Sequence, residues 1–593
     1  MSLGRAIATV GSFTLLSRIV GFVRDIVLSA VLGSGGIADA FFVALKLPNF
    51  FRRLFAEGAF SAAFVPLFAR ELQGGGREAA LAFARQAHAG LVLVLVPFAI
   101  VLIAAMPWVL SLLAPGLRAD PGTFDLAVEF SRIAFPYLIF ISLASLYGGV
   151  LNGIERFAEV AVTPVLLNVA LIGAVLGLTP FLPNGGYAAS IGVTIGGLLQ
   201  WAWLLASCAR DGVGMKLVRP RWTERVARLI KLATPVAIGG GVQTISVMLD
   251  VVWASLMPIG TISALYYADR LAQLPLGVVG IAIGTALLPL LARQLRAGEN
   301  TAAMANQNRA IEFGLLFSLP AALALWQLAE PMIRVLFERG QFQADDTLRT
   351  ASALAALAVG LPAFVVVKAL TPGFFAREDT RTPLYAAIAA ISFNIALNAL
   401  FLFFSSLHQV GIALASSLAG WLNAAVLGGI LMHRGHLEPD SRLLSRAARV
   451  IAATVGMGAV LWLALMLARP MMAHSDLGGF LGLAAVCVVG VLAYGLLGAA
   501  LRIVNISELR FVMRRQPGEV VIKMDNDVWF HQKGWVEDLE ACIAADSGIG
   551  IIGLKRKDLI DWPLLPVNHE DRTCLIPLPR KGVERWLIVE QTY

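Results

Sequence analysis

Charged residues interrupt an otherwise apolar stretch near the start of the chain, residues 17–72. In chain order they are Arg18, Arg24, Asp25, Asp39, Lys46, Arg52, Arg53 and Glu57. An Arg or Lys near the middle of a membrane helix costs about 2.5–3.5 kcal/mol on insertion scales, so a helix that faces lipid would not keep several of them. We therefore expect these side chains to face a protein interior or a water-filled cavity, where clustered positive charge favours an anionic ligand.

The alternative for these charges is a structural role. Arg18 and Arg24 would then anchor a helix end at lipid headgroups, and Arg53 with Glu57 would be a simple i,i+4 pair. Helix geometry favours the cavity, because Arg18 and Asp25 are seven residues apart and share a helix face. Arg24 of the first helix and Arg52 of the second are also expected at the same depth in the membrane.

The composition is that of a membrane protein. The 593 residues are 58% hydrophobic and only 15% charged, with a mean hydropathy of +0.76. A soluble globular chain is near half apolar and a quarter charged. The net charge of +8 would suggest nucleic acid in a soluble protein, but in a membrane protein Lys and Arg collect in the loops on one side, so we expect no nucleic-acid partner. The cysteines show neither metal-ligand spacing nor a disulfide framework.

Hydropathy predicts an all-α polytopic membrane fold with fourteen transmembrane helices. The first two cover about residues 6–32 and 38–68 and are joined by a glycine-rich turn. The other twelve lie near residues 86–113, 127–151, 160–181, 186–207, 230–257, 264–292, 310–328, 350–371, 383–405, 409–432, 448–468 and 478–501. Each is long enough to cross roughly 30 Å of hydrocarbon at 1.5 Å per residue.

The loops set the orientation of these helices. With the N-terminus inside, the inward loops carry twenty Lys and Arg residues and the outward loops carry five. This is a strong positive-inside asymmetry. An even number of helices then puts both termini in the cytoplasm.

An internal repeat divides the helices into two sets. Residues 66–72 (PLFAREL) recur as residues 289–295 (PLLARQL), at an offset of 223. At an offset of 226, two further pairs agree: Pro136 with Pro362, and Asn168 with Asn394. Helices 1–6 and 7–12 are therefore predicted to be copies of one bundle, and an even helix number makes the copies parallel. Transporters of this kind bind substrate between the halves, where Lys46 would meet Asp269 and Arg270.

Six short motifs resemble one family of membrane proteins. They are residues 17–25 (SRIVGFVRD), 38–41 (ADAF), 47–49 (LPN), 52–60 (RRLFAEGAF), 266–271 (YYADRL) and 373–377 (GFFAR). Over about residues 1–510 the chain resembles the MurJ (MviN) family of lipid II flippases, in the multidrug/oligosaccharidyl-lipid/polysaccharide (MOP) exporter superfamily.

The resemblance implies the domain organisation. It implies an N-lobe in residues 1–208, a C-lobe in residues 209–434, and a final helix pair in residues 435–510 that forms a groove for a polyprenyl tail. This is the two-lobed MATE/MOP-like fold. Residues 516–593 lie outside it.

The resemblance also implies the function. Lipid II, an undecaprenyl-pyrophosphate-linked disaccharide-pentapeptide, would move from the inner to the outer leaflet of the bacterial cytoplasmic (inner) membrane, in support of peptidoglycan biosynthesis and cell shape. The implied partners are lipid II, membrane lipids and other cell-wall synthesis proteins. The chain would be a transporter, not an enzyme, and would require no cofactor. The alternative is a related exporter of another polyprenyl-linked glycan or a drug, although a basic cavity suits a lipid-linked anion better than a drug.

Particular residues carry over from the motifs. The expected substrate-binding charges are Arg18, Arg24, Arg52 and Arg270, with Asp25 orienting Arg24 and Asp39 at an outer gate. Guanidinium forks match phosphate oxygens in pairs, which fits the pyrophosphate. A second set also stands in or beside the motifs, with pairing inside the bundle as the alternative role: Ser17, Lys46, Arg53, Glu57 and Asp269.

A cation site is a further hypothesis. Asp250 stands in the predicted seventh helix, and Asn394 and Asn398 stand one turn apart in the eleventh. The resemblance implies oxygen ligands for Na⁺ at the matching positions, but Asn398 stands where a carboxylate can occur, so the site carries less charge. The alternative is that Asp250 bonds backbone or a neighbouring Asn. Coupling to Na⁺ or to the membrane potential is left open.

The tail follows a different pattern. Residues 518–527 (GEVVIKMDND) predict a buried strand that ends in acidic residues. This resembles the middle of a GT-A glycosyltransferase, in which Asp525 and Asp527 would hold a divalent metal. The nucleotide-binding half that should precede it is missing. We expect a short α/β-like cytoplasmic fragment with a vestigial metal site that does not catalyse.

Overall fold

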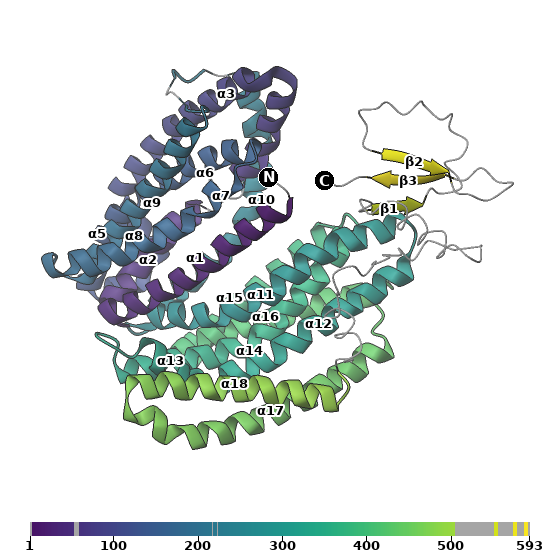
Figure 1. Cartoon of the computed structure of the whole chain (residues 1–593). Coiled ribbons are helices and arrows are strands. Elements are labelled where there is room, and N and C mark those ends of the chain that lie inside the picture. The colour runs from purple at the N-terminus through teal and green to yellow at the C-terminus, as the bar shows by residue number, and fades with distance from the viewer. Residues whose placement is uncertain are drawn as a thin grey trace. The chain divides into compact units, whose positions relative to one another are not determined.

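The computed structural model describes residues 3–52, 59–215, 218–221, 223–503, 551–554, 573–577 and 586–590. The chain forms two units, Met1–Ile506 and Ser507–Tyr593, which are considered separately. The first unit is helical, and the described part of the second consists of strands (Figure 1).

The helices follow one another with short connections. In chain order they are α1 (Leu3–Leu32), α2 (Gly36–Arg52), α3 (Ala59–Ala104), α4 (Met106–Leu113), η2 (Pro115–Ala119), α5 (Pro121–Ala134), α6 (Tyr137–Gly153), α7 (Phe157–Ala161), α8 (Thr163–Leu178), η3 (Thr179–Phe181), α9 (Gly185–Arg210), α10 (Glu224–Ser255), α11 (Thr261–Arg296), α12 (Asn300–Gln327), α13 (Ala329–Phe337), α14 (Ala344–Phe375), α15 (Arg381–Phe404), α16 (His408–His433), α17 (Ser441–His474) and α18 (Asp476–Ala500). Several starts carry the side-chain caps that polar residues supply: Asn184 before α9, Thr223 before α10 and Asp440 before α17.

Ten described segments are long and apolar enough to cross a membrane, judged by length and composition. The unit is therefore a multi-pass, all-α membrane fold, as the sequence predicted. Four predicted spans are not among the ten, namely the ones that contain α1, α2, α10 and α11. These are the first two helices of each predicted repeat, and each of the four spans includes residues whose side chains lie outside the description of the structure. The total of fourteen stays a prediction.

The helices pack in two groups (Figure 1). In one group α6 and α8 lie against α9, α3 lies against α6, and α1 lies against α8. In the other, α14 packs on α11, α12 and α16, and α15 on α16. The helix α10 packs chiefly on α3, although the sequence repeat would place it with the second group.

The last two helices form a hairpin that is attached through α12 (Figure 1). Glu312 of α12 is buried and forms ion pairs with Arg309 and with Arg446 of α17. Asn308 Nδ2 donates to the carbonyl oxygen of Glu438 at 2.7 Å, just before α17 begins. Near the other end of α12, Gln327 Nε2 donates to the Gly458 carbonyl of α17 at 3.0 Å. Polar contacts thus fix the hairpin to the second group at both ends of α12.

An aromatic cluster joins the two groups at one end, where α1 turns into α2 and α10 into α11. Phe42 of α2 stacks on Tyr266 of α11 with ring centroids 3.8 Å apart. Tyr267 lies 5.3 Å from Phe337 and 5.6 Å from Phe342, centroid to centroid. We call this the closed end. The ribbons of the two groups separate toward the opposite end, where α1 begins (Figure 1).

The two halves share a local backbone feature. Glu155 and Glu378 both have a left-handed backbone, with φ of 63° and 61°, at an offset of 223 residues. The matched prolines behave differently, because the helix breaks at Pro136, between α5 and α6, whereas Pro362 lies inside the continuous helix α14.

The second unit contains an antiparallel sheet with strand order β1-β3-β2, from β1 (Ile551–Leu554), β2 (Thr573–Pro577) and β3 (Trp586–Glu590). In the register, Glu590 of β3 pairs with Ile551 and with Thr573. The predicted strand with Asp525 and Asp527 lies outside the described residues.

Candidate functional site

A cavity of about 310 Å³ lies between the two groups of helices, beside the aromatic cluster. Four cations line it, and none of the described residues that line it is a carboxylate. The polar and aromatic part of the lining comprises Arg24 of α1; Phe42, Lys46, Asn49, Phe50 and Arg52 of α2; Tyr137 of α6; Asn168 of α8; and Tyr266 and Arg270 of α11. The cavity therefore presents positive charge from both halves of the chain to anything that enters it.

Arg24 is held in a fixed orientation. Its Nη2 and Nε donate to Asp25 Oδ1 at 2.7 and 3.1 Å, and its Nη1 donates to Asn168 Oδ1 at 2.8 Å. Asn168 in turn donates through Nδ2 to the carbonyl oxygen of Ser17 at 3.2 Å. Asp25 is 3% exposed, so this ion pair is shielded from water. The expected contact between Asp25 and Arg24 is present, and Ser17 joins it through its backbone.

Arg270 approaches the same point from the second group. Its guanidinium carbon lies 4.6 Å from the centroid of the Tyr266 ring, and Tyr266 Oη donates to Asp25 Oδ1 at 3.5 Å. The Nε of Arg270 is buried without a hydrogen-bond partner among the described residues. An unsatisfied buried donor costs about 1–3 kcal/mol, and more when charged. An anionic oxygen placed in the cavity would remove that penalty.

The remaining lining cations come from α2. Arg52 Nε donates to Asn49 Oδ1 at 3.2 Å, so the arginine is braced within its own helix. The carboxyl of Asp250 in α10 interacts electrostatically with the charged side chains of Lys46 and Asp269. Asp269 itself accepts a hydrogen bond from Gln273. Of the second set of predicted residues, Lys46 lines the cavity, and Asp269 is not among the described residues that line it.

Arg18 is not among the described residues that line this cavity. Arg18 is exposed, and its guanidinium lies against Gly277 of α11. Arg53 and Glu57 lie outside the described residues.

At the closed end, Asp39 binds the start of α11. Its Oδ2 accepts from Gly260 N at 2.7 Å, and its Oδ1 accepts from Ser263 N at 2.7 Å and from Ser263 Oγ at 2.6 Å. The first amides of a helix lack partners within the helix, and Gly260 has no side chain to cap them. Asp39, which is 1% exposed, supplies the missing cap from α2 in the other group.

Further contacts close this end. Ser34 Oγ lies 3.0 Å from Ser263 Oγ, and Tyr267 Oη donates to the Gly33 carbonyl at 3.2 Å. Gln341 N donates to the Ala30 carbonyl at 2.8 Å. The cavity is therefore sealed on the side of the α1–α2 turn.

The residues predicted to bind Na⁺ have different partners. Asn398 Nδ2 donates to Asn394 Oδ1 at 3.0 Å, and Asn394 Nδ2 lies 3.3 Å from Ser416 Oγ. Asp250 has the charged neighbours described above. Within the described ranges no group of three His, Cys, Asp or Glu side chains could hold a metal ion. The Na⁺ site stays a prediction, and Asp525 and Asp527 lie outside the described residues.

Comparison with known proteins decides the family. A family model described as "Lipid II flippase MurJ" matches residues 28–477. The chain belongs to this family. The motifs of the sequence therefore identified it correctly, and membership places the helical unit among transporters rather than enzymes.

Two individual relatives support the same family assignment. A probable lipid II flippase MurJ of Rhizobium meliloti (strain 1021) is 44% identical over 523 residues, covering 86% of this chain and 97% of the relative. The lipid II flippase MurJ of Burkholderia cenocepacia is 35% identical over 470 residues, covering 78% and 91%.

Two solved structures share the fold. A lipid II flippase MurJ in an inward closed conformation matches with a TM-score of 0.68 and 25% identity, over 85% of this chain and 99% of that one. An inward-facing MATE-family multidrug transporter of the MOP superfamily matches with a TM-score of 0.60 and 15% identity, over 70% and 94%. The second likeness concerns the fold alone.

Sequence reasoning did not name two residues of the site. Asn168, which binds Arg24, entered only as a marker of the repeat, and Tyr266 only as part of a motif. A polar amide inside the apolar helix α8, matched by Asn394 in the other half, was the signal available for Asn168.

Proposed function

We propose that this protein binds lipid II through its pyrophosphate in the cavity of Arg24, Lys46, Arg52 and Arg270, and moves it from the inner to the outer leaflet of the bacterial cytoplasmic membrane by alternating access. The observation that carries the proposal is a cavity between the two groups with four lining cations, among them Arg270, whose Nε has no hydrogen-bond partner in the part of the chain that the structure describes. Membership of the lipid II flippase family names the anion.

The chemistry of the cavity suits a pyrophosphate. Arg24 is pre-oriented by Asp25 and Asn168, so little side-chain entropy is lost when phosphate oxygens bind it. Arginine pairs bidentately with phosphate, and such bonds strengthen where water is excluded. A large polar headgroup cannot cross hydrocarbon without such a site.

The volume limits what the cavity holds. About 310 Å³ lies at the lower end of small-molecule sites. The cavity thus fits the pyrophosphate but not the whole disaccharide-pentapeptide. The bulk of the headgroup would extend from the cavity away from the closed end.

Release on the other side requires the closed end to open. Opening separates Asp39 from Gly260 and Ser263 and exposes the start of α11 to water. Hydrogen bonds to a charged group contribute about 1.5–3 kcal/mol each, and water replaces these contacts once the end opens. Contacts of this size hold the end shut and still allow it to open as the transporter cycles.

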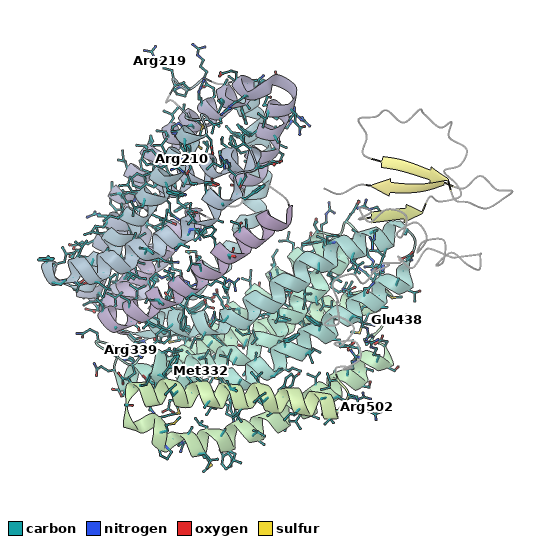
Figure 2. The ribbon with its side chains drawn as sticks, in the orientation of Figure 1. Arg210, Arg219, Met332, Arg339, Glu438 and Arg502 are labelled. Carbon is teal, nitrogen blue, oxygen red and sulfur yellow. The ribbon has the colours of Figure 1, made fainter. Side chains whose placement is uncertain are left out.

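The finer architecture belongs to the same proposal: fourteen spans, parallel lobes in residues 1–208 and 209–434, and cytoplasmic termini. The matched left-handed backbones of Glu155 and Glu378 support two copies of one bundle. Arg210 and Arg219, from a predicted inward loop, lie at the far side of the unit from Arg339 of a predicted outward loop (Figure 2).

The helix pair in residues 435–510 would hold the polyprenyl tail. Its helices expose large apolar side chains, including Val455, Leu467, Val491 and Leu496, at 64–73% of their surface. No cofactor is part of the proposal. Coupling to Na⁺ or the membrane potential, and contact with other cell-wall synthesis proteins, are open to test.

Complementation tests the proposal. Expression of this chain in a bacterium depleted of its own lipid II flippase should restore growth and cell shape. Failure to restore growth, at an accumulation equal to that of a working flippase, would contradict the proposal. Dissipating the Na⁺ gradient or the membrane potential separately in the complemented strain identifies the coupling.

A further inference from the structure

Two cations outside the cavity lie on the same face of α11. The guanidinium of Arg18, from α1, lies over Gly277, where its Nη1 is 3.1 Å from the position that a Cβ would take. The stem of Lys368, from α14, lies over Gly280, with Cγ at 3.5 Å from the corresponding position. Gly277 and Gly280 are three residues apart and therefore neighbours on one helix face.

Arg18 and Gly277 lie about two helical turns from the cavity cations of their own helices. Arg18 precedes Arg24 by six residues on α1, and Gly277 follows Arg270 by seven on α11. At 1.5 Å per residue both separations are roughly 10 Å. Both run away from the closed end, so Arg18 and Lys368 lie on the side from which the proposed substrate enters.

A purely structural role does not account for the pair. Lys368 is exposed although it stands within Ala344–Phe375, one of the apolar segments able to span a membrane. Arg18 is exposed as well, and neither cation forms an ion pair with a carboxylate of the described residues. Two like charges brought to one helix face by different groups repel each other unless an anion lies between them.

We propose that Arg18 and Lys368 form a first station for the pyrophosphate of lipid II, which the headgroup occupies before it moves along α11 to Arg24 and Arg270. The inference rests on the proposed function and adds Lys368 as a substrate-binding residue. Gly277 is part of the station, because a side chain at this position would displace the guanidinium of Arg18.

A station on the entry path makes a kinetic prediction. Removing the charge of the station lowers the association rate of an anion and weakens the dependence of this rate on salt. The dissociation rate from the deeper cavity stays unchanged. The purified full chain in nanodiscs of phosphatidylcholine would be titrated with a short-chain, water-soluble lipid II analogue, and its association and dissociation rates measured at several salt concentrations. Lys368→Gln should lower the association rate about 3- to 10-fold with the dissociation rate within about twofold.

Matched variants separate the station from a general effect of charge. Lys368→Arg should keep the association rate. Arg210→Gln removes an exposed cation from the end of α9 and should change nothing. Gly277→Ala should slow association, whereas Gly280→Ala should not, since its methyl group makes only ordinary contacts of 3.4–3.5 Å. Size-exclusion profiles and thermal unfolding confirm that each variant is folded.

Four outcomes would overturn the inference. They are an unchanged association rate in folded Lys368→Gln, an equal loss in Arg210→Gln, equal effects of the two glycine variants, and an effect of Lys368→Gln only in nanodiscs that contain phosphatidylglycerol. The last would identify an anionic phospholipid headgroup as the occupant. Inorganic pyrophosphate, titrated in parallel, should show the same loss if the phosphates alone are recognised. If the unsubstituted chain fails to bind the analogue, the proposed function itself fails, which is a distinct result.

Discussion

Neutralising Asp39 should shift the protein toward a state in which the closed end is open. Asp39→Asn keeps the shape of the side chain but removes its charge and one of its two acceptor oxygens. The carboxylate accepts three hydrogen bonds of 2.6–2.7 Å from Gly260 and Ser263. Hydrogen bonds to a charged group contribute about 1.5–3 kcal/mol each. The amide loses at least one of these bonds and places an N–H donor against another donor.

The expected loss is therefore about 2–3 kcal/mol, and only the closed state bears it, because water replaces the contacts once the groups separate. A change of this size shifts the closed-to-open ratio about 30- to 150-fold. Ser263→Ala removes one of the three bonds and should shift it less. Asp120→Asn is the matched control, since Asp120 bonds Thr123 Oγ1 within its own segment, at 2.6 Å, and does not bridge the groups.

Spin-label distances across the closed end measure this ratio. One label replaces Gly35 in the α1–α2 turn, where an added Cβ meets no atom within 4 Å. The other replaces Leu348 of α14, which is 54% exposed. With the native cysteines removed, Asp39→Asn should add a population at longer distance that Asp120→Asn lacks. Identical distance distributions for all three proteins would refute the role of Asp39 as a cap across the two groups.

Three other perturbations test separate parts of the molecule. Arg270→Ala should abolish complementation at normal accumulation, because the charge and the Nε donor, which has no partner among the described residues, are lost. Arg270→Lys should restore part of the activity, because Lys keeps the positive charge but lacks the planar fork of Arg. Growth with the Ala variant would show that Arg270 does not hold the headgroup. Hydrogen bonds from Thr382 and Arg434 hold the pKa of Asp379, in the α14–α15 loop, well below its usual range. The contribution of Asp379 to stability is therefore present above the unfolded pKa of about 4 and is lost as pH falls below it. The unfolding midpoint of Asp379→Asn should lie below that of the unsubstituted chain at pH 7 and approach it at low pH, and a difference in midpoint that does not depend on pH would contradict this. Glu312→Gln should destabilise the protein by about 2–3 kcal/mol, because it removes the buried carboxylate that Arg309 and Arg446 pair with. Thermal unfolding in detergent measures this effect, and an unchanged midpoint would show that these ion pairs contribute nothing to stability.

Much of the fold followed from the sequence because long apolar runs have few alternatives to membrane helices. The apolar segments are helical wherever the structure describes them, and Arg24, Lys46, Arg52 and Arg270 converge as their positions in a two-fold repeat suggested.

Contacts between distant segments did not follow from the sequence. Asn168 binds Arg24 across 144 residues, and Asp39 binds Gly260 across 221. A single sequence indicates which residues are polar but not which of them meet. The packing of α10 on α3 could not be predicted for the same reason, because hydropathy does not indicate which helices pack against each other. Pro136 and Pro362 show that even a matched proline breaks one helix and not another.

The helices that line the cavity carry charged residues inside long helices, and this relates function to insertion. Arg24 belongs to α1, Lys46 and Arg52 to α2, and Arg270 to α11. Their charges disfavour insertion one by one and are offset only after the halves assemble, as when Arg24 meets Asp25 and Asn168. Removing a cavity arginine therefore makes its helix more apolar and eases insertion. Loss of flipping in such a variant, at normal accumulation, consequently reports on the site and not on a failure to enter the membrane.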